Sequence, residues 1–134
     1  MRIFIANLII IRFHLRVFIA EAIHFRRKLR IGSVRSKILA AVPERSHMIL
    51  LAIDGKQRSS EDFSAHLDDL ALRGMSDLTF VIGGSDGVSD EVRARADETF
   101  SFGPITLPHN LARVVLLEQL YRACKISRGE PYHK

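Results

Sequence analysis

Residues 78–92, LTFVIGGSDGVSDEV, determine the fold class, because an apolar run leads through a glycine-rich stretch into a helix start. Residues 78–82 have the compact apolar composition of a buried strand. Residues 83–87 form a loop, and Ser89 can cap a helix over 89–99 whose first turn carries two acidic side chains. A strand followed by a loop and a helix is typical of an α/β domain.

The residues before this unit repeat its order. The apolar run 48–53 predicts another buried strand, closed by a turn at Asp54 and Gly55. A helix then begins near the N-cap candidate Ser59 and ends at Gly74. Its apolar face comprises Phe63, Leu67, Leu70 and Ala71. Alternating strands and helices predict a parallel sheet whose ligand site lies beyond the carboxyl ends of the strands.

The C-terminal part is predicted to be a loop followed by a long helix. Residues 100–108 contain Gly103, Pro104 and Pro108, so they form an ordered loop with room for one short strand. The final helix starts near His109, and its apolar residues are Leu111, Val114, Val115, Leu116, Leu117, Leu120, Tyr121 and Cys124. Because these cover more than one stripe, the helix needs burial on two sides. In so small a domain this favours a homodimer over deep burial within one chain.

The N-terminal third has weaker periodicity. Residues 1–11 are rich in β-branched side chains and predict a strand, residues 13–30 are helix-like, and residues 34–42 predict a short helix. The first apolar stretch stops at Arg12, too soon for a membrane span, and no good signal cleavage site follows. We therefore expect a cytoplasmic protein without a membrane segment. A basic amphipathic stretch lying on a membrane surface is the alternative.

The 134-residue chain is long enough for one hydrophobic core and too short for two, so residues 1–134 are expected to form a single domain. Its formal charge of +5 is unevenly spread. Residues 1–46 hold ten of the 20 Lys and Arg against two of the 15 acidic residues, and the tail from His109 is basic again. Such ends are expected of a protein that binds a phosphate backbone, although a solvated charged face is the simpler interpretation.

Two loops carry residues that suggest a ligand site. The loop 83–87 precedes Asp90 and Glu91, whose charges would repel a pyrophosphate at that helix start. This favours a ligand without phosphate groups, and S-adenosylmethionine, with its cationic sulfonium, meets that requirement. The loop 103–108 combines a rigid backbone with apolar side chains, which suits a pocket for a flat base, unless the loop is only a structural connector.

Metal-binding patterns are absent from the sequence. The six His have no pair at metal-ligand spacing and Cys124 is the single cysteine, so no metal site and no internal disulfide are expected. His109 and His133 could act as an acid, a base or a nucleic-acid contact, with ordinary surface histidines as the alternative. Methyl transfer needs neither a P-loop nor a nucleophile elbow, because its cofactor brings the electrophile.

Three segments together resemble the ribosomal RNA large subunit methyltransferase H family of the SPOUT class. They are FVIGGSDGV at 80–88, TLPH at 106–109, and LARVVLLEQLYRA at 111–123 with the ending PYHK at 131–134. With 50–60 and 70–77 included, the resemblance covers about the last two thirds of the chain. It implies a SPOUT-type parallel sheet with helices on both faces and a deep C-terminal trefoil knot. It also implies a homodimer whose cofactor pocket lies in the knot.

The resemblance further implies roles for individual residues. S-adenosylmethionine would contact Leu51, Gly83, Gly103, Pro104, Ile105, Thr106, Leu107 and Pro108. The implied activity is methylation of N3 of a pseudouridine in 23S ribosomal RNA, within the assembled ribosome. The residues near the target base would be His109, Arg122, Tyr132 and His133. Of these, Arg122 would assist deprotonation of the ring, and the tail would close over the site.

The N-terminal part departs from the family pattern. Residues 1–6 resemble the opening strand, but the Gly-Lys pair that normally follows is absent, and about forty further residues match poorly. Two alternatives to an active ribosomal methyltransferase therefore stay open. One is a dimeric cofactor-binding relative with a lost or altered RNA substrate, and the other is a non-enzymatic basic RNA-binding module.

Overall fold

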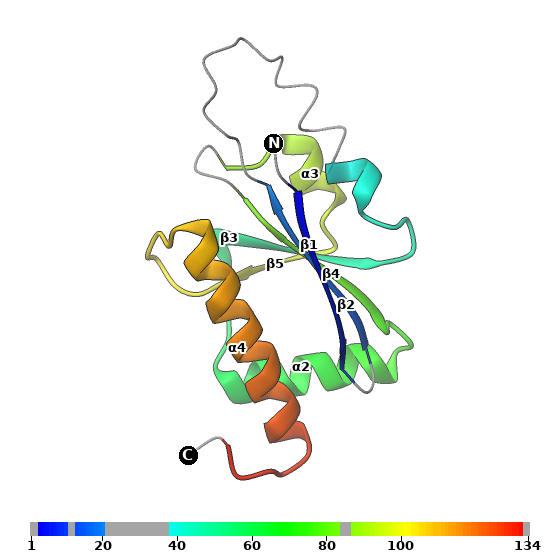
Figure 1. The fold of residues 1–134 in the computed structure, drawn as a ribbon, viewed down its shortest axis with the longest axis vertical. Coiled ribbons are helices and arrows are strands. Elements are labelled where there is room, and N and C mark those ends of the chain that lie inside the picture. The colour runs from blue at the N-terminus through cyan, green and yellow to red at the C-terminus, as the bar shows by residue number, and fades with distance from the viewer. Residues whose placement is uncertain (1–2, 11–12, 21–37, 84–86, 133–134) are drawn as a thin grey trace.

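The computed structural model describes residues 3–10, 13–20, 38–83 and 87–132. Its elements, in chain order, are β1 (Ile3–Ile10), β2 (Phe13–Ala20), β3 (His47–Gln57), α2 (Ser60–Leu72), β4 (Asp77–Ile82), α3 (Asp90–Arg95), β5 (Glu98–Ser101) and α4 (His109–Ser127). In this described part the strands form a five-stranded sheet in the order β1-β2-β4-β3-β5 (Figure 1). Strands β2, β4, β3 and β5 are parallel, and β1 is an antiparallel edge strand. The predicted α/β fold with a parallel sheet is confirmed.

Helices cover both faces of the sheet, because neighbouring residues of the buried strands point to opposite sides. On one face Ile49 of β3 and Phe80 of β4 pack with the buried side chains of α2 and α4. On the other face Leu50 and Val81 pack with Val92 of α3 and with a helical turn at residues 38–41, which lies beside α3 in Figure 1. This two-sided burial explains why both central strands have continuous apolar sequences.

Strand β2 corrects the helix expected over 13–30, since residues 13–20 are extended. They pair in parallel with β4, from His14 opposite Asp77 to Ile19 opposite Ile82. The physical reason is that β4 offers an open edge for pairing, to which the alternation of apolar Phe13, Leu15 and Val17 with polar His14 and Arg16 is suited because it has the period of a strand. Residues 21–30 lie outside the described residues. The strand predicted over 1–11 is confirmed by β1.

Strand β3 also differs from the prediction, because the turn expected at Asp54 and Gly55 is wrong. The strand continues to Gln57, and its pairing with β5 shifts register between Leu51 and Lys56. A Cβ at Gly55 would lie only 2.7–2.9 Å from backbone atoms of Phe100. The glycine is therefore needed for a close approach of two strands at a β-bulge.

The helix expected over 89–99 ends early, at Arg95, and Glu98–Ser101 forms β5. The chain turns away at Ala96, which has extended backbone angles (φ −62°, ψ 130°). The backbone N–H of Met48 donates to the Asp97 carboxylate at 2.7 Å, so the residue after the turn is fastened to β3. Pairing with β3 thus prevails over the local helical tendency.

Local capping signals were read correctly from the sequence. The Ser59 hydroxyl accepts the N–H of Asp62 at 3.0 Å at the start of α2. Gly74 follows the end of that helix with φ +80°, a conformation that side-chain-bearing residues rarely adopt. The short helix expected over 34–42 is observed at 38–41, and residues 34–37 lie outside the described part.

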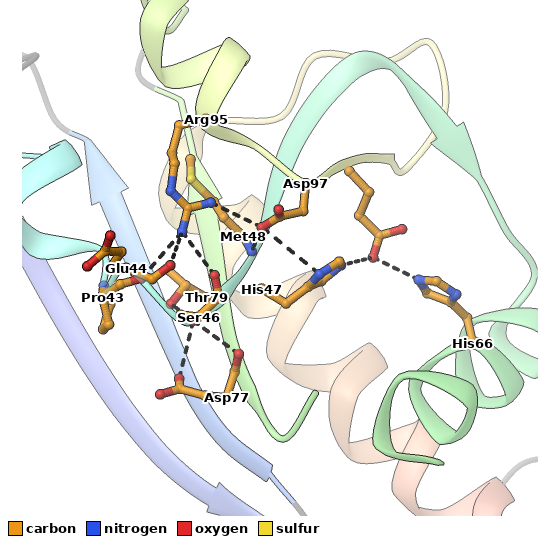
Figure 2. Close-up of polar contacts among 11 residues, drawn as sticks. Pro43, Glu44, Ser46, His47, Met48, His66, Asp77, Thr79, Arg95 and Asp97 are labelled. Carbon is orange, nitrogen blue, oxygen red and sulfur yellow. Dashed lines mark hydrogen bonds and ion pairs between the residues drawn. The ribbon is translucent and has the colours of Figure 1, made fainter. Parts of the chain in front are cut away.

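A polar network closes the amino ends of the parallel strands, and Figure 2 shows its side chains. The buried Ser46 hydroxyl lies 2.6 Å from the Thr79 hydroxyl and donates to the Asp77 carbonyl at 3.1 Å. Arg95 donates to the Asp97 carboxylate and to the backbone carbonyls of residues 43, 44 and 46. These bonds satisfy polar groups that the edge of the sheet would otherwise bury unpaired.

Glu98 connects the start of β5 to β3, to α2 and to Arg58 between them. Its Oε1 lies 3.2 Å from Nε2 of His47 and 2.8 Å from Nε2 of His66, and its Oε2 lies 3.1 Å from an Arg58 nitrogen. Burial alone would raise the pKa of this carboxyl, but the hydrogen bonds from the two histidines and the charge of Arg58 outweigh it and lower the pKa. The ionised carboxylate therefore stabilises this end of the sheet.

Candidate functional site

A cavity of about 690 Å³ opens at the carboxyl ends of β3, β4 and β5, which is where ligands bind in parallel α/β sheets. The loop 102–108 and the start of α4 complete its wall. Seven of the eight predicted cofactor contacts line it: Leu51, Gly83, Gly103, Ile105, Thr106, Leu107 and Pro108. Pro104 belongs to the same loop but is exposed and is not part of the wall. Residues far apart in the sequence thus meet at one place.

The buried Ser101 fixes the loop that forms one side of the cavity. Its hydroxyl lies 2.9 Å from the Ile53 carbonyl and 3.1 Å from the Gly103 carbonyl, and it accepts the Gly103 N–H at 3.1 Å. Gly103 has φ +109°, which strongly favours glycine. The chain therefore leaves β5 in a defined direction, held to β3 by one hydroxyl.

The inner surface of the cavity is mainly apolar. Phe100 and Ile82 are buried at the ends of their strands, and the Phe100 and Phe102 rings pack edge to face with centroids 5.3 Å apart. A Cβ at Gly83 would lie 3.2 Å from a Val88 methyl group, so glycine allows the segments on either side of the loop to approach closely. Apolar walls with backbone polar groups suit a nucleoside-sized ligand.

Two charged residues in the wall were missed by the sequence reading. Asp54 and Arg93 both line the cavity, and Nη1 of Arg93 lies 3.1 Å and 3.0 Å from the two carboxylate oxygens of Asp54. The sequence predicts a turn at Asp54, but the β3 bulge places this residue in the cavity wall. No local sequence signal reveals that bulge, because it depends on the pairing with β5.

His109 lies in the cavity wall, as the first residue of α4 directly after Pro108. Pro108 occupies the N-cap position and supplies no side-chain hydrogen bond there. The fold therefore places His109 beside the predicted cofactor contacts.

Arg122 and Tyr132 form a separate cluster with Glu118 near the other end of α4. Glu118 Oε1 accepts from Arg122 Nε at 2.9 Å and from Nη2 at 2.5 Å, and the Tyr132 hydroxyl lies 3.4 Å from the same oxygen. The guanidinium also lies 5.0 Å from the centre of the Tyr132 ring. The hydrogen bond from Arg122 holds the pKa of Glu118 below its usual value, and the same bond raises the pKa of Arg122. Both side chains stay charged near neutral pH.

Within one chain the two groups are far apart. His109 and Arg122 are 13 residues apart on one helix, which corresponds to about 20 Å at 1.5 Å per residue. The structure therefore joins Arg122 with Tyr132 and joins His109 with the cavity, but it does not bring these pairs together in a single copy. His133 lies outside the described residues.

Neither a metal group nor a membrane span is found in the part of the chain that can be described. Across 38–83 and 87–132, His, Cys, Asp and Glu side chains form no group of three that could hold a metal ion. The described helices are also too short or too polar to cross a bilayer.

Comparison with known proteins identifies the family of the chain. A family profile described as "Predicted SPOUT methyltransferase" matches residues 14–133. A protein of Listeria welshimeri named ribosomal RNA large subunit methyltransferase H is 60% identical over 98 residues, which are 73% of this chain and 62% of the relative. Relatives of the same name from Latilactobacillus sakei and Desulfitobacterium hafniense are 57% and 56% identical over 98 residues, with 73% of this chain and 62% and 61% of the relative covered. The chain thus spans less than two thirds of the length of these relatives. The profile match and the identities together show that the chain belongs to the SPOUT methyltransferase family.

Proposed function

We propose that the chain is an S-adenosylmethionine-dependent methyltransferase that methylates N3 of a pseudouridine in 23S ribosomal RNA, on the assembled ribosome. The observation that carries this proposal is the cavity at the carboxyl ends of the parallel strands, with seven predicted cofactor contacts in its wall. The name shared by the curated relatives supports ribosomal RNA as the substrate. The proposal includes the deep trefoil knot and the cytoplasmic location that the family resemblance implies.

The residues present fit the cofactor. A cavity of about 690 Å³ lies within the roughly 300–1,000 Å³ range of small-molecule sites. Leu51, Ile82 and Leu107 offer apolar contact to an adenine ring, and the loop held by Ser101 presents backbone groups to its edge. The cofactor, when bound, supplies an electrophilic methyl group, so the protein needs to orient the base and assist removal of the N3 proton.

Arg122 and His109 are proposed to assist this deprotonation. Loss of the N3 proton leaves a negative charge on the pyrimidine ring, and a permanently charged guanidinium stabilises such a charge. Glu118 and Tyr132 hold the Arg122 guanidinium in one orientation. His109 stands next to the cofactor loop and is proposed to accept the proton.

A homodimer explains how groups about 20 Å apart on α4 can serve one base. Leu111, Val114 and Tyr121 are 48%, 55% and 48% exposed, and their spacing gives α4 a half-exposed apolar stripe, at one end of which the Tyr121 ring packs edge to face on Tyr132. We place a second copy against this stripe, so that Arg122 and Tyr132 of one subunit complete the cavity of the other.

Subunit mixing tests the shared site. Arg122→Ala removes the charge donated to the other subunit, and Gly103→Val, strained at φ +109°, is expected to distort the cavity wall of its own subunit. Each variant alone is expected to be inactive. A mixture that forms heterodimers should regain roughly a quarter of the wild-type activity, because half of the dimers are mixed and each has one intact site. A mixture that stays inactive would contradict the composite site.

The activity itself is tested on ribosomes from a strain that lacks the modification. The chain is incubated with these ribosomes and with S-adenosylmethionine labelled in the methyl group, and the RNA is then digested and examined by mass spectrometry. The expected product is N3-methylpseudouridine in 23S RNA. Cofactor binding without methyl transfer would favour a relative with a lost substrate, and RNA binding without cofactor binding would favour a basic RNA-binding module.

A further inference from the structure

A contribution to folding stability does not explain why the ion pair between Asp54 and Arg93 lies where it does. It joins the bulged part of β3 to α3 at the cavity wall. The side chains of Arg93 and Asp54 are 46% and 70% exposed. Pairs as exposed as this contribute little to folding stability, because water already solvates both charges. The two side chains are therefore available for other partners at small cost.

Among the described residues that line the cavity, Asp54 and Arg93 alone carry full opposite charges. A phosphate would gain Arg93 but would face the negative charge of Asp54. A simple cation or anion would contact only one of the two side chains. An α-amino acid group carries an ammonium and a carboxylate on the same carbon, so it can replace both halves of the pair at once.

We propose that Asp54 and Arg93 bind the amino-acid end of the cofactor, with Arg93 donating to its carboxylate and Asp54 accepting from its ammonium. This assignment rests on the proposed function, in which the cavity holds S-adenosylmethionine. The apolar walls and the loop 103–108 then receive the nucleoside, and the charged pair selects nucleosides that carry a free amino acid. Both the cofactor and its demethylated product carry this group, so the pair contributes equally to binding of the two.

Calorimetric titration with four ligands tests each contact separately. The ligands are S-adenosylmethionine, S-adenosylhomocysteine, decarboxylated S-adenosylmethionine and 5′-methylthioadenosine, which lacks the amino acid. Arg93→Gln should lower the affinity for the first two ligands by roughly tenfold or more, the usual effect of losing a charge-assisted hydrogen bond. It should leave the two ligands without a carboxylate within about twofold of wild type.

Asp54→Asn distinguishes the ammonium from the sulfonium. It should lower the affinity for S-adenosylhomocysteine, which has no sulfonium, as much as the affinity for S-adenosylmethionine, and should leave the affinity for 5′-methylthioadenosine unchanged. The matched control is Arg73→Gln, which removes another exposed ion pair, with Asp69 on α2, away from the cavity. This control should bind all four ligands like the wild type.

Two results would overturn the assignment. Arg93→Gln with unchanged affinity for S-adenosylmethionine would show that the guanidinium makes no contact, and equal weakening of all four ligands would indicate a general change in the cavity. Failure of the proposed function looks different, because the wild-type protein would then bind none of the four ligands.

Discussion

Replacing Ser101 with alanine is expected to damage the cavity more than the fold. The Ser101 hydroxyl is buried and links the Ile53 carbonyl of β3 to the N–H of Gly103. Ser101→Ala leaves both backbone groups without this partner. At about 1 kcal/mol for each net hydrogen bond, the variant should lose about 2 kcal/mol of unfolding free energy.

This loss converts into a measurable change in melting temperature. An unfolding entropy of roughly 2.1 cal/mol/K per residue gives about 0.28 kcal/mol/K for this chain. Ser101→Ala should therefore lower Tm by about 7 °C. Because Gly103 lies in the cavity wall, affinity for S-adenosylmethionine should also fall, by about tenfold.

Ser64→Ala is the matched control. Ser64 is equally buried, and its hydroxyl donates to the Ala123 carbonyl at 2.8 Å, where α2 packs on α4. It should lower Tm by about 4 °C, as one hydrogen bond predicts, and leave cofactor affinity unchanged. Calorimetry and thermal melts on both variants decide the matter. If Ser101→Ala bound the cofactor normally, or Ser64→Ala bound it equally weakly, Ser101 would have no specific role in shaping the site.

Gly103→Ala should lower the unfolding free energy by about 1–3 kcal/mol and weaken cofactor binding, because alanine is strained at φ +109°. Gly129→Ala, at φ +65° outside the cavity, should lower the unfolding free energy alone. Thermal melts and calorimetry compare them, and equal cofactor loss in both would refute the reasoning. The lowered pKa of Glu98 stabilises the fold above the carboxyl's unfolded-state pKa, and this stability is lost as pH falls through the folded-state pKa. Glu98→Gln should therefore flatten the acid limb of stability against pH; an unchanged limb in urea unfolding would contradict this. Val114→Asp should convert a dimer to monomers in light scattering, whereas Leu72→Asp, on an exposed α2 residue, should not. A monomeric wild type would remove the basis for the composite site.

The sequence predicts the local structure correctly where contacts between near neighbours alone determine it. The Ser59 cap and the left-handed Gly74 were expected from residue type, and both are present. The buried strand at 78–82 and the helix start at Ser89 followed from an apolar run and a capping residue. These features depend on contacts between near neighbours in the chain.

Features decided by distant pairing were misread. Residues 13–20 become a strand because β4 offers an open edge, and Glu98–Ser101 becomes β5 because β3 does. Asp54 and Gly55 have the composition of a turn, yet the approach of Phe100 keeps them in a bulged strand. Sheet register of this kind is not visible in a single stretch of sequence.

The candidate site was likewise predictable from the sequence only in part. The cofactor positions were expected from the family resemblance, and seven of them meet at one cavity. The expectation that His109 and Arg122 lie near one base is not met within one chain, because α4 separates them by about 20 Å. Asp54 and Arg93 were missed because only the folded sheet brings them to the same wall.

The claim that the cavity holds S-adenosylmethionine is tested most directly by titrating the cofactor into ¹⁵N-labelled protein and following the backbone amide signals. The account predicts large shifts for Leu51, Gly83 and Gly103, which line the cavity, and unchanged signals for the exposed part of α2 around Leu72. No shifts at high micromolar cofactor, or shifts confined to residues away from the carboxyl ends of β3, β4 and β5, would contradict it.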